Sequence, residues 1–315
     1  MTTWNDSDGP AMAHVAAYAG IPSFMRQPVR RDLAGVDVAV VGVPYDGGAN
    51  TLHAGTRLGP RAIRESSLLI AGFHLGYRFN PLQYLRVVDY GDLAVELTSI
   101  EKNIELVAEQ ASQIAGSGAT LLTLGGDHSI TYPLLMAHAQ AHGPLAVIQF
   151  DAHTDTEEGH HNHGTPFVDA IRAGVLDASA YLQVGIRGGW YPQDPIAEAE
   201  SLGAKVLTID HCFEMGMPAI IHWIRQKVGD RAVYLSLDID AVDPAYAPGT
   251  GAPEIGGFTS YQILQLVRGL KGLNIVGYDL VEVNPQLDPA SITSLLGASL
   301  AYEFLCLEAC AKHTA

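Results

Sequence analysis

Cysteine is scarce in this chain of 315 residues: only Cys212, Cys306 and Cys310 occur. Their spacing matches no zinc motif, and an odd number of thiols cannot all pair with one another, so a secreted disulfide framework is not expected. The first residues carry acidic side chains and a Gly-Pro step instead of an apolar signal core. We therefore expect a cytoplasmic protein.

Positive charge is also sparse. Lys and Arg number 18 against 34 Asp and Glu, which gives a formal net charge of −16. Such a balance argues against nucleic acid or an anionic membrane as a partner, and it is compatible with a cationic ligand. No stretch reaches the roughly 18 consecutive apolar residues of a membrane span, so none is expected.

Apolar, β-branched runs recur along the chain, and Gly, Asp or Pro closes each of them. The expected strands are Val36–Val43, Leu85–Val88, Ala119–Leu124, Leu145–Phe150, Tyr181–Val184, Lys205–Ile209, Val233–Leu237 and Asn274–Val281. Helical patterns lie between most of them, for example Ile100–Gly116, Tyr132–His142, Ile196–Leu202, Pro218–Val228 and Ser260–Leu270. This alternation is typical of a parallel sheet covered on both faces. Because no linker or internal repeat interrupts it, we expect one domain over residues 1–315, with residues 1–34 as an N-terminal extension.

Three of these strands end in short runs that are rich in potential metal ligands. The runs are Gly125–Ser129, Asp151–Asp155 and Ser236–Asp240. Ligands of open parallel sheets bind beyond the carboxyl ends of the strands, so these side chains should converge. The six potential ligands are His128, Asp151, His153, Asp155, Asp238 and Asp240.

Four carboxylates and two imidazoles exceed what one divalent ion needs, and they suit two ions that share bridging ligands. That arrangement points to a hydrolase that activates water with metal. The oxygen-rich donors favour Mn²⁺, although Ni²⁺ or Co²⁺ could occupy the same ligands. The alternative interpretation is that these residues only cap helices or bind phosphate.

The motifs around these ligands resemble the ureohydrolase family, which includes arginases and agmatinases, over almost the whole chain. The matching segments are Gly42–Pro44, Gly59–Arg64, Gly125–Ser129, Phe150–Asp155, Ser236–Glu254 and Asp279–Pro285. The resemblance implies a three-layer α/β/α domain with an eight-stranded parallel sheet, usually assembled as a trimer or hexamer. It also implies hydrolysis of a guanidino group to urea and an amine.

The same resemblance assigns roles to the six ligands. Asp151 and Asp238 would bridge two ions. One ion would be completed by His128 and Asp155, and the other by His153 and Asp240.

Two further residues of the motifs would act on the substrate. Glu282, at the end of the last expected strand, would hold the guanidinium by paired hydrogen bonds, and its alternative role is a helix-entry or salt-bridge residue. His163 would carry protons to the departing amine, although His160 and His161 lie in the same loop. Asp155 would also hydrogen-bond the nucleophile.

Two loops, Tyr45–Arg57 and Thr156–Phe167, should contact the tail of the substrate. Many agmatinase-like proteins have an arginine where this chain has His53, and its loss weakens the case for a carboxylate tail, unless Arg57 supplies that contact. Agmatine, 4-guanidinobutyrate, a smaller guanidine and a substituted biguanide all remain open. The candidate rim residues are Asn50, His53, Arg57, Asn162, Trp190, Tyr191 and Thr250.

Two other interpretations belong to different classes of protein. A deacetylase with a single zinc ion on a related fold needs fewer ligands than this chain retains. A catalytically inactive scaffold subunit normally lacks a ligand or the histidine at position 163, and neither is missing here. We expect an active homo-oligomer, with a mixed oligomer containing a paralogous chain as the alternative.

Overall fold

A single sheet of eight parallel strands forms the centre of the protein. The computed structural model describes residues 16, 19–49, 53–189 and 193–314. The strands are β1 (Val38–Gly42), β2 (Val87–Asp92), β3 (Thr120–Leu124), β4 (Leu145–Phe150), β5 (Leu176–Ile186), β6 (Lys205–Thr208), β7 (Val233–Asp238) and β8 (Ile275–Val281). All neighbouring pairs are parallel, in the order β2-β1-β3-β8-β7-β4-β5-β6.

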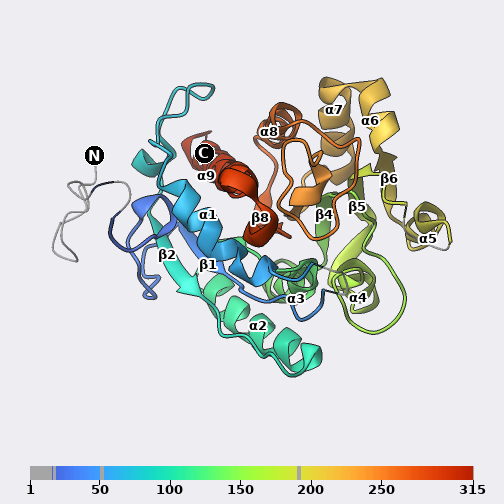
Figure 1. The fold of residues 1–315 in the computed structure, drawn as a ribbon, viewed down its shortest axis with the longest axis horizontal. Coiled ribbons are helices and arrows are strands. Elements are labelled where there is room, and N and C mark those ends of the chain that lie inside the picture. The colour runs from blue at the N-terminus through green and yellow to red at the C-terminus, as the bar shows by residue number, and fades with distance from the viewer. Residues whose placement is uncertain (1–15, 17–18, 50–52, 190–192, 315) are drawn as a thin grey trace.

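Helices cover both faces of this sheet (Figure 1). One apolar layer joins the sheet to α1 (Gly59–Ser67), α6 (Ile209–Met215), α7 (Met217–Val228), α8 (Ser260–Gly269) and α9 (Ile292–Thr314). The other layer joins it to α2 (Ile100–Ala115), α3 (Thr131–His142), α4 (Pro166–Arg172) and α5 (Pro195–Ser201). The predicted three-layer α/β/α architecture is therefore confirmed.

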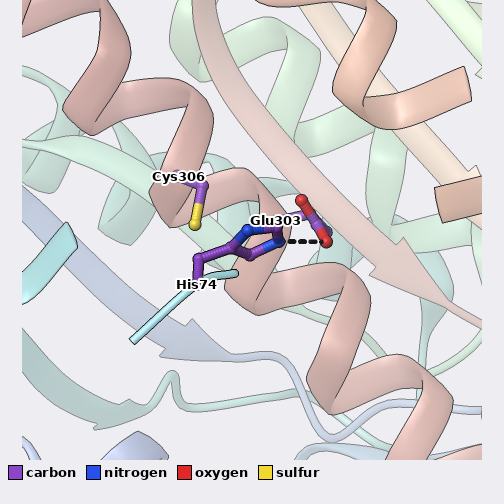
Figure 2. Close-up of side chains that lie close together, drawn as sticks. All are labelled: His74, Glu303 and Cys306. Atoms are coloured by element: carbon purple, nitrogen blue, oxygen red, sulfur yellow. Dashed lines mark hydrogen bonds and ion pairs between the residues drawn. The ribbon is translucent and has the colours of Figure 1, made fainter. Parts of the chain in front are cut away.

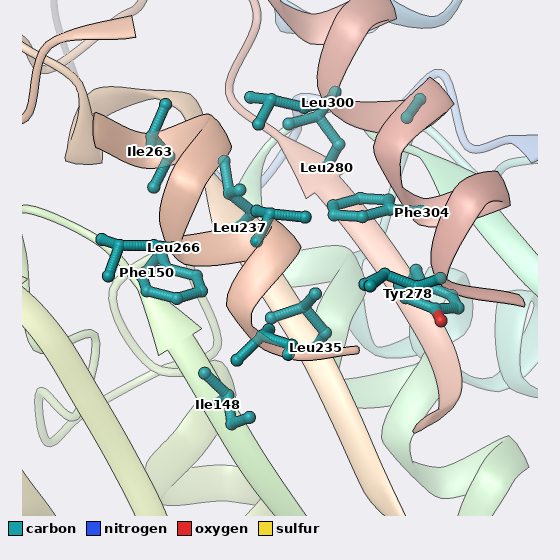
Figure 3. Packing of buried hydrophobic residues seen from close by; sticks show 14 of the residues in the cluster. Ile148, Phe150, Leu235, Leu237, Ile263, Leu266, Tyr278, Leu280, Leu300 and Phe304 are labelled. Atoms are coloured by element: carbon teal, nitrogen blue, oxygen red, sulfur yellow. The ribbon is translucent and has the colours of Figure 1, made fainter. Parts of the chain in front are cut away.

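Alternate residues of one strand serve the two layers, because successive side chains of a strand point to opposite faces. On β4, Ile148 and Phe150 belong to the layer under α8 and α9, whereas Val147 belongs to the other layer. Figure 3 shows the first of these layers, where strand side chains meet Ile263 of α8 and Phe304 of α9. Burial on both faces explains why the strands are continuous apolar runs.

The C-terminal helix α9 belongs to this core. Within the described part of the chain, one segment, Pro289–Lys312, is long and apolar enough to cross a membrane by length and composition alone. In this fold, 72% of its apolar window is buried inside the protein. Its apolar character therefore has an explanation in the packing against the sheet.

Part of the predicted N-terminal extension packs against the domain. Phe24 is fully buried, and its backbone N–H donates to Asp89 Oδ2 over 2.7 Å. Asp89 also accepts from Arg64 Nε of α1 over 2.8 Å, in an ion pair that is almost completely buried. One buried carboxylate thus ties the N-terminal segment and α1 to the edge strand β2.

The four central strands of the sheet end side by side at the same edge. β3, β8, β7 and β4 are consecutive neighbours in the sheet, although they come from positions 120 to 281 of the chain. Because all strands are parallel, their carboxyl ends lie along one edge. The residues at or just after these ends are His128, Glu282, Asp238 and Asp151.

Candidate metal centre

The first group of ligands surrounds the imidazole of His128. Its Nδ1 atom lies 2.8 Å from Asp155 Oδ2, 3.2 Å from Asp151 Oδ2 and 3.3 Å from Asp238 Oδ2. His128 is completely buried, and the three carboxylates are nearly so. Although Nδ1 is so close to these oxygens, it forms no hydrogen bond of acceptable geometry.

The hydrogen bond of Nε2, the other ring nitrogen of His128, determines whether Nδ1 carries a hydrogen. Ser236 Oγ donates its hydrogen to Asp279 Oδ1 over 2.7 Å, so it accepts from His128 Nε2 over 2.9 Å. In the neutral imidazole, which carries its hydrogen on Nε2, Nδ1 presents a lone pair to three carboxylate oxygens. Four lone-pair donors that face one another in the interior fit a metal cation.

The second group of ligands shares Asp151 with the first. His153 Nδ1 lies 2.9 Å from Asp240 Oδ2 and 3.7 Å from Asp151 Oδ1. The two oxygens of Asp151 therefore face different histidines: Oδ2 faces His128, and Oδ1 faces His153. A carboxylate in that position can bridge two ions. The predicted bridging by Asp238 stays a prediction, because only its Oδ2 faces a histidine of the two groups, His128, within the described part of the chain.

Burial and like charge disfavour the anionic form of two of the metal-free carboxylates, Asp151 and Asp238. The pKa of Asp151 rises to about 7, because burial disfavours its charge and Asp155 and Asp240 repel it. Burial and the charges of Asp240 and Asp151 raise the pKa of Asp238 well above its usual value. Divalent cations would relieve this repulsion, which is a further sign that the residues fit two metal ions.

Backbone hydrogen bonds hold the ligand loop in an unusual conformation. The N–H of His153 donates to Asp151 Oδ1 over 2.6 Å, and that of Ala152 donates to Asp240 Oδ1 over 3.0 Å. Asp155 has φ of +50° and Glu282 has φ of +63°, a region that residues other than glycine rarely adopt. Strain of this kind is concentrated at functional sites.

Glu282 and His163 lie directly beside the first group. Glu282 Oε1 accepts from the backbone N–H of His128 over 2.9 Å and lies 2.9 Å from His163 Nδ1. Burial lowers the pKa of His163, but Glu282 more than compensates and raises it to about 9. Both contacts use Oε1 of Glu282, so neither of them occupies Oε2.

The other predicted rim residues differ in what they contact. Asn162 Oδ1 accepts from the backbone N–H of Gly164 over 2.7 Å and so braces its own loop. His53 is exposed, whereas Thr250 is buried and its hydroxyl has no hydrogen-bond partner among the described residues. Trp190, Asn50 and Tyr191 lie outside the described residues.

Arg57 is held in an ion pair by Asp46. The carboxylate of Asp46 is almost completely buried, while the side chain of Arg57 is 51% exposed. A cavity of about 290 Å³ adjoins this pair, and its lining residues are Asp46, Ala54, Gly55, Arg57, Leu58 and Gln286. Since Asp46 already neutralises Arg57, the predicted contact between Arg57 and an anionic tail loses much of its strength.

A second cluster of metal-ligand types is buried elsewhere, between the segment around residue 74 and α9. Figure 2 shows His74, Glu303 and Cys306 side by side, with His74 Nε2 2.9 Å from Glu303 Oε1. Here Arg268 supplies the cation: its Nε and Nη2 donate to Glu303 Oε1 over 2.9 and 2.5 Å. Arg268 therefore neutralises Glu303, whereas no Arg or Lys of the described chain forms an ion pair with the carboxylates around His128.

Comparison with known proteins agrees with this geometry. A profile of the arginase family matches residues 36–307. The mitochondrial agmatinase of Gallus gallus is 43% identical over 302 residues, which cover 95% of this chain and 88% of that protein. The guanidinopropionase of Pseudomonas aeruginosa is 42% identical, with 96% of each chain covered.

Solved structures give the same result. The proclavaminate amidino hydrolase of Streptomyces clavuligerus superposes with a TM-score of 0.90 at 41% identity, covering 94% of this chain and 99% of that one. A hypothetical agmatinase from Burkholderia thailandensis superposes with a TM-score of 0.89 at 44% identity, covering 95% and 94%. The predicted fold and the predicted activity class are thus confirmed. The chain belongs to the arginase family, and it is an amidinohydrolase that cleaves C–N bonds of guanidino compounds at a site for two metal ions.

Proposed function

We propose that this enzyme hydrolyses a guanidino compound without a carboxylate tail, such as agmatine, to urea and an amine. The observation that carries the reaction is the position of Glu282. Its Oε1 accepts from the backbone N–H of the ligand His128, so a guanidinium held by this carboxylate lies next to the ligand group. A planar cation needs such a carboxylate for orientation.

Bound divalent ions would lower the pKa of a water molecule to about 7 and so supply the nucleophile at neutral pH. Glu282 orients the guanidinium carbon toward the ligands. Asp155 accepts a hydrogen bond from the attacking water, because its carboxylate belongs to the first ligand group. His163 lies 2.9 Å from Glu282 and donates the proton that the departing amine requires.

We propose Mn²⁺ as the ion. Asp and His donors without thiolate suit a hard or borderline divalent ion. Ni²⁺ and Co²⁺ fit the same donor set and are the alternatives that a metal comparison must include.

Two observations support a substrate tail that is cationic or uncharged. The loop with Arg57 lies close to the site, because the carbonyl of His53 accepts from Asn284 Nδ2 over 3.0 Å and the carbonyl of Gly48 accepts from the N–H of His163 over 3.0 Å. In this loop Asp46 already neutralises Arg57. A carboxylate tail on the substrate would therefore have to compete with Asp46 for the guanidinium group of Arg57.

Glu157 provides the second observation. Its carboxyl group packs against Gly164, next to His163: a Cβ atom at Gly164 would meet Glu157 Cδ at 2.9 Å. Burial and the nearby charge of Asp155 raise the pKa of Glu157, whereas His163 and His153 lower it. A carboxylate in this place attracts a cationic tail and repels an anionic one.

Replacing Glu157 should change the preference between substrates. We expect the native enzyme to have a higher kcat/KM for agmatine than for 4-guanidinobutyrate. Glu157→Gln should reduce the ratio of the two values by roughly 3–10-fold, because a partly exposed charge pair contributes about 1 kcal/mol. Steady-state urea release with both substrates measures the ratio.

Glu158→Gln is the matched control. Glu158 neighbours Glu157 in the chain but is 79% exposed and pairs with Arg172, so its loss should leave the ratio unchanged. A higher kcat/KM of the native enzyme for 4-guanidinobutyrate than for agmatine would refute the proposal that the substrate lacks a carboxylate tail.

Replacing Glu282 and replacing His163 should change different kinetic constants. Glu282→Gln should lower kcat/KM by roughly 10²–10³-fold, as expected when one partner of a buried ion pair is lost. His163→Ala should lower kcat by roughly 10²–10⁴-fold, the usual contribution of a general acid. Both variants should retain their metal, which elemental analysis of the purified chains checks.

His160→Ala, in the exposed part of the same loop, serves as the control and should keep native kinetics. Native urea release by Glu282→Gln would remove Glu282 from substrate binding, and an unchanged kcat in His163→Ala would remove His163 from proton transfer.

Metal binding should release protons and strengthen as the pH rises. Burial lowers the metal-free pKa of His128 and of His153, but the surrounding carboxylates more than compensate and raise it well above the usual value. Each imidazole must lose a proton before it can bind an ion, so affinity should increase from pH 6 to pH 9. Calorimetric titration of the metal-free chain with Mn²⁺, in buffers of different ionisation enthalpy, measures the protons released. Affinity that is constant over this range would contradict the ligand assignment.

A further inference from the structure

Three polar side chains lie together in the interior directly below the metal loop. Gln149 belongs to β4, and Tyr181 and Gln183 belong to the neighbouring strand β5, where Gln149 pairs in register with Gln183. All three are completely buried. Buried amides and hydroxyls are costly unless they form hydrogen bonds, so their partners should show what holds them there.

Gln149 connects this cluster to the ligand Asp151. Its Nε2 donates to Asp151 Oδ2 over 2.7 Å and to the carbonyl of His153 over 3.2 Å. Its Oε1 accepts from Tyr181 Oη and, over 3.0 Å, from Gln183 Nε2. The amide has only this orientation, because the reverse one would place Oε1 against a carboxylate oxygen and Nε2 against two donors.

The cluster also holds the backbone of the metal loop. Gln183 Nε2 donates to the carbonyl of Thr154 over 2.5 Å. Thr154 precedes Asp155, whose φ of +50° must be maintained by its surroundings. Tyr181 in turn stacks on Phe167, with 5.1 Å between ring centroids, and Phe167 meets the ring of His128 edge-on at 5.2 Å.

The hydrogen bond from Gln149 selects which oxygen of Asp151 faces which histidine. The oxygen that it contacts, Oδ2, is the one that faces His128, while Oδ1 accepts from the backbone of His153. Both oxygens are thus fixed before any ion binds. A neutral amide does this without the opposite charge that Arg or Lys would bring to compete with metal.

We propose that Gln149, supported by Tyr181 and Gln183, is a positioning residue that orients Asp151 so that its two oxygens face different metal ions. The inference rests on the binuclear site of the proposed function. It assigns part of the metal affinity to a residue that touches neither an ion nor the substrate.

Gln149→Met tests the proposal, because methionine keeps the length of the side chain and removes both the donor and the acceptor. Titration of the metal-free chain with Mn²⁺ against a chelating indicator dye should show at least one ion bound roughly 10–100-fold more weakly, the usual effect of losing a partner of a metal ligand. The electron paramagnetic resonance signal of the coupled Mn²⁺ pair should also change. Saturating Mn²⁺ should restore most of the urea release, since Gln149 does not contact the substrate.

Tyr181→Phe is the second variant, in case Gln149→Met fails to fold. It removes the hydroxyl that holds Gln149 Oε1 and keeps the ring that stacks on Phe167, so it should weaken binding of the same ion by a smaller factor. Thr123→Val is the control and should leave Mn²⁺ binding unchanged. Thr123 is equally buried in the sheet, and its hydroxyl has no hydrogen-bond partner within the described part of the chain.

The native chain is titrated with Mn²⁺ first, so that a failure of the binuclear site can be distinguished from a failure of the role of Gln149. Fewer than two Mn²⁺ ions per native chain would contradict the binuclear site itself. Two ions in the native chain, with unchanged affinities and an unchanged resonance signal in folded Gln149→Met, would overturn the role of Gln149 alone.

Discussion

Buried negative charge at one edge of the sheet is the constraint on which the site depends. Asp151, Asp155, Asp238 and Asp240 lie within the ligand groups of two histidines, and nearly all of this surface is removed from water. Such charges are strongly unfavourable without counter-ions. No Arg or Lys of the described chain forms an ion pair with any of these four carboxylates. The cluster of His74 and Glu303 differs for this reason, because Arg268 supplies its positive charge.

The sheet topology explains how residues so far apart in sequence form one site. The candidate ligands come from the ends of β3, β4 and β7, and Glu282, the carboxylate proposed to hold the guanidinium, follows the end of β8. These are the four central strands, each hydrogen-bonded to the next. Their side chains therefore converge without long loops. The side chains that converge must also be oriented. Ser236 contacts the imidazole of His128, and Gln149 donates to the carboxylate of Asp151.

Much of this arrangement could be predicted from the sequence. The strands are largely apolar runs, which is why a run was recognised for each of the eight, and the ligand motifs lie at or just after the ends of three of them. β5 was predicted too short, since its first half contains Asp177 and Ser179 and lacks that pattern. The helix α9 was not predicted either: it is buried on most sides, so it has no polar face to give it a helical period.

The partners of the site residues could not be predicted, because pairing across strands is not visible in a single sequence. A glutamine in a strand, such as Gln149, has no motif that marks it as the partner of a ligand. Similarly, Arg57 was expected to contact the substrate, and only the structure pairs it with Asp46. In both cases the sequence does not reveal which side chain contacts the residue in the folded protein.

The most direct test of the account is anomalous diffraction from crystals of the native chain loaded with Mn²⁺. The account predicts two peaks about 3.5–4 Å apart, one beside His128 and Asp155 and the other beside His153 and Asp240, with Asp151 between them. A single peak, or two peaks too far apart for Asp151 to bridge, would contradict it.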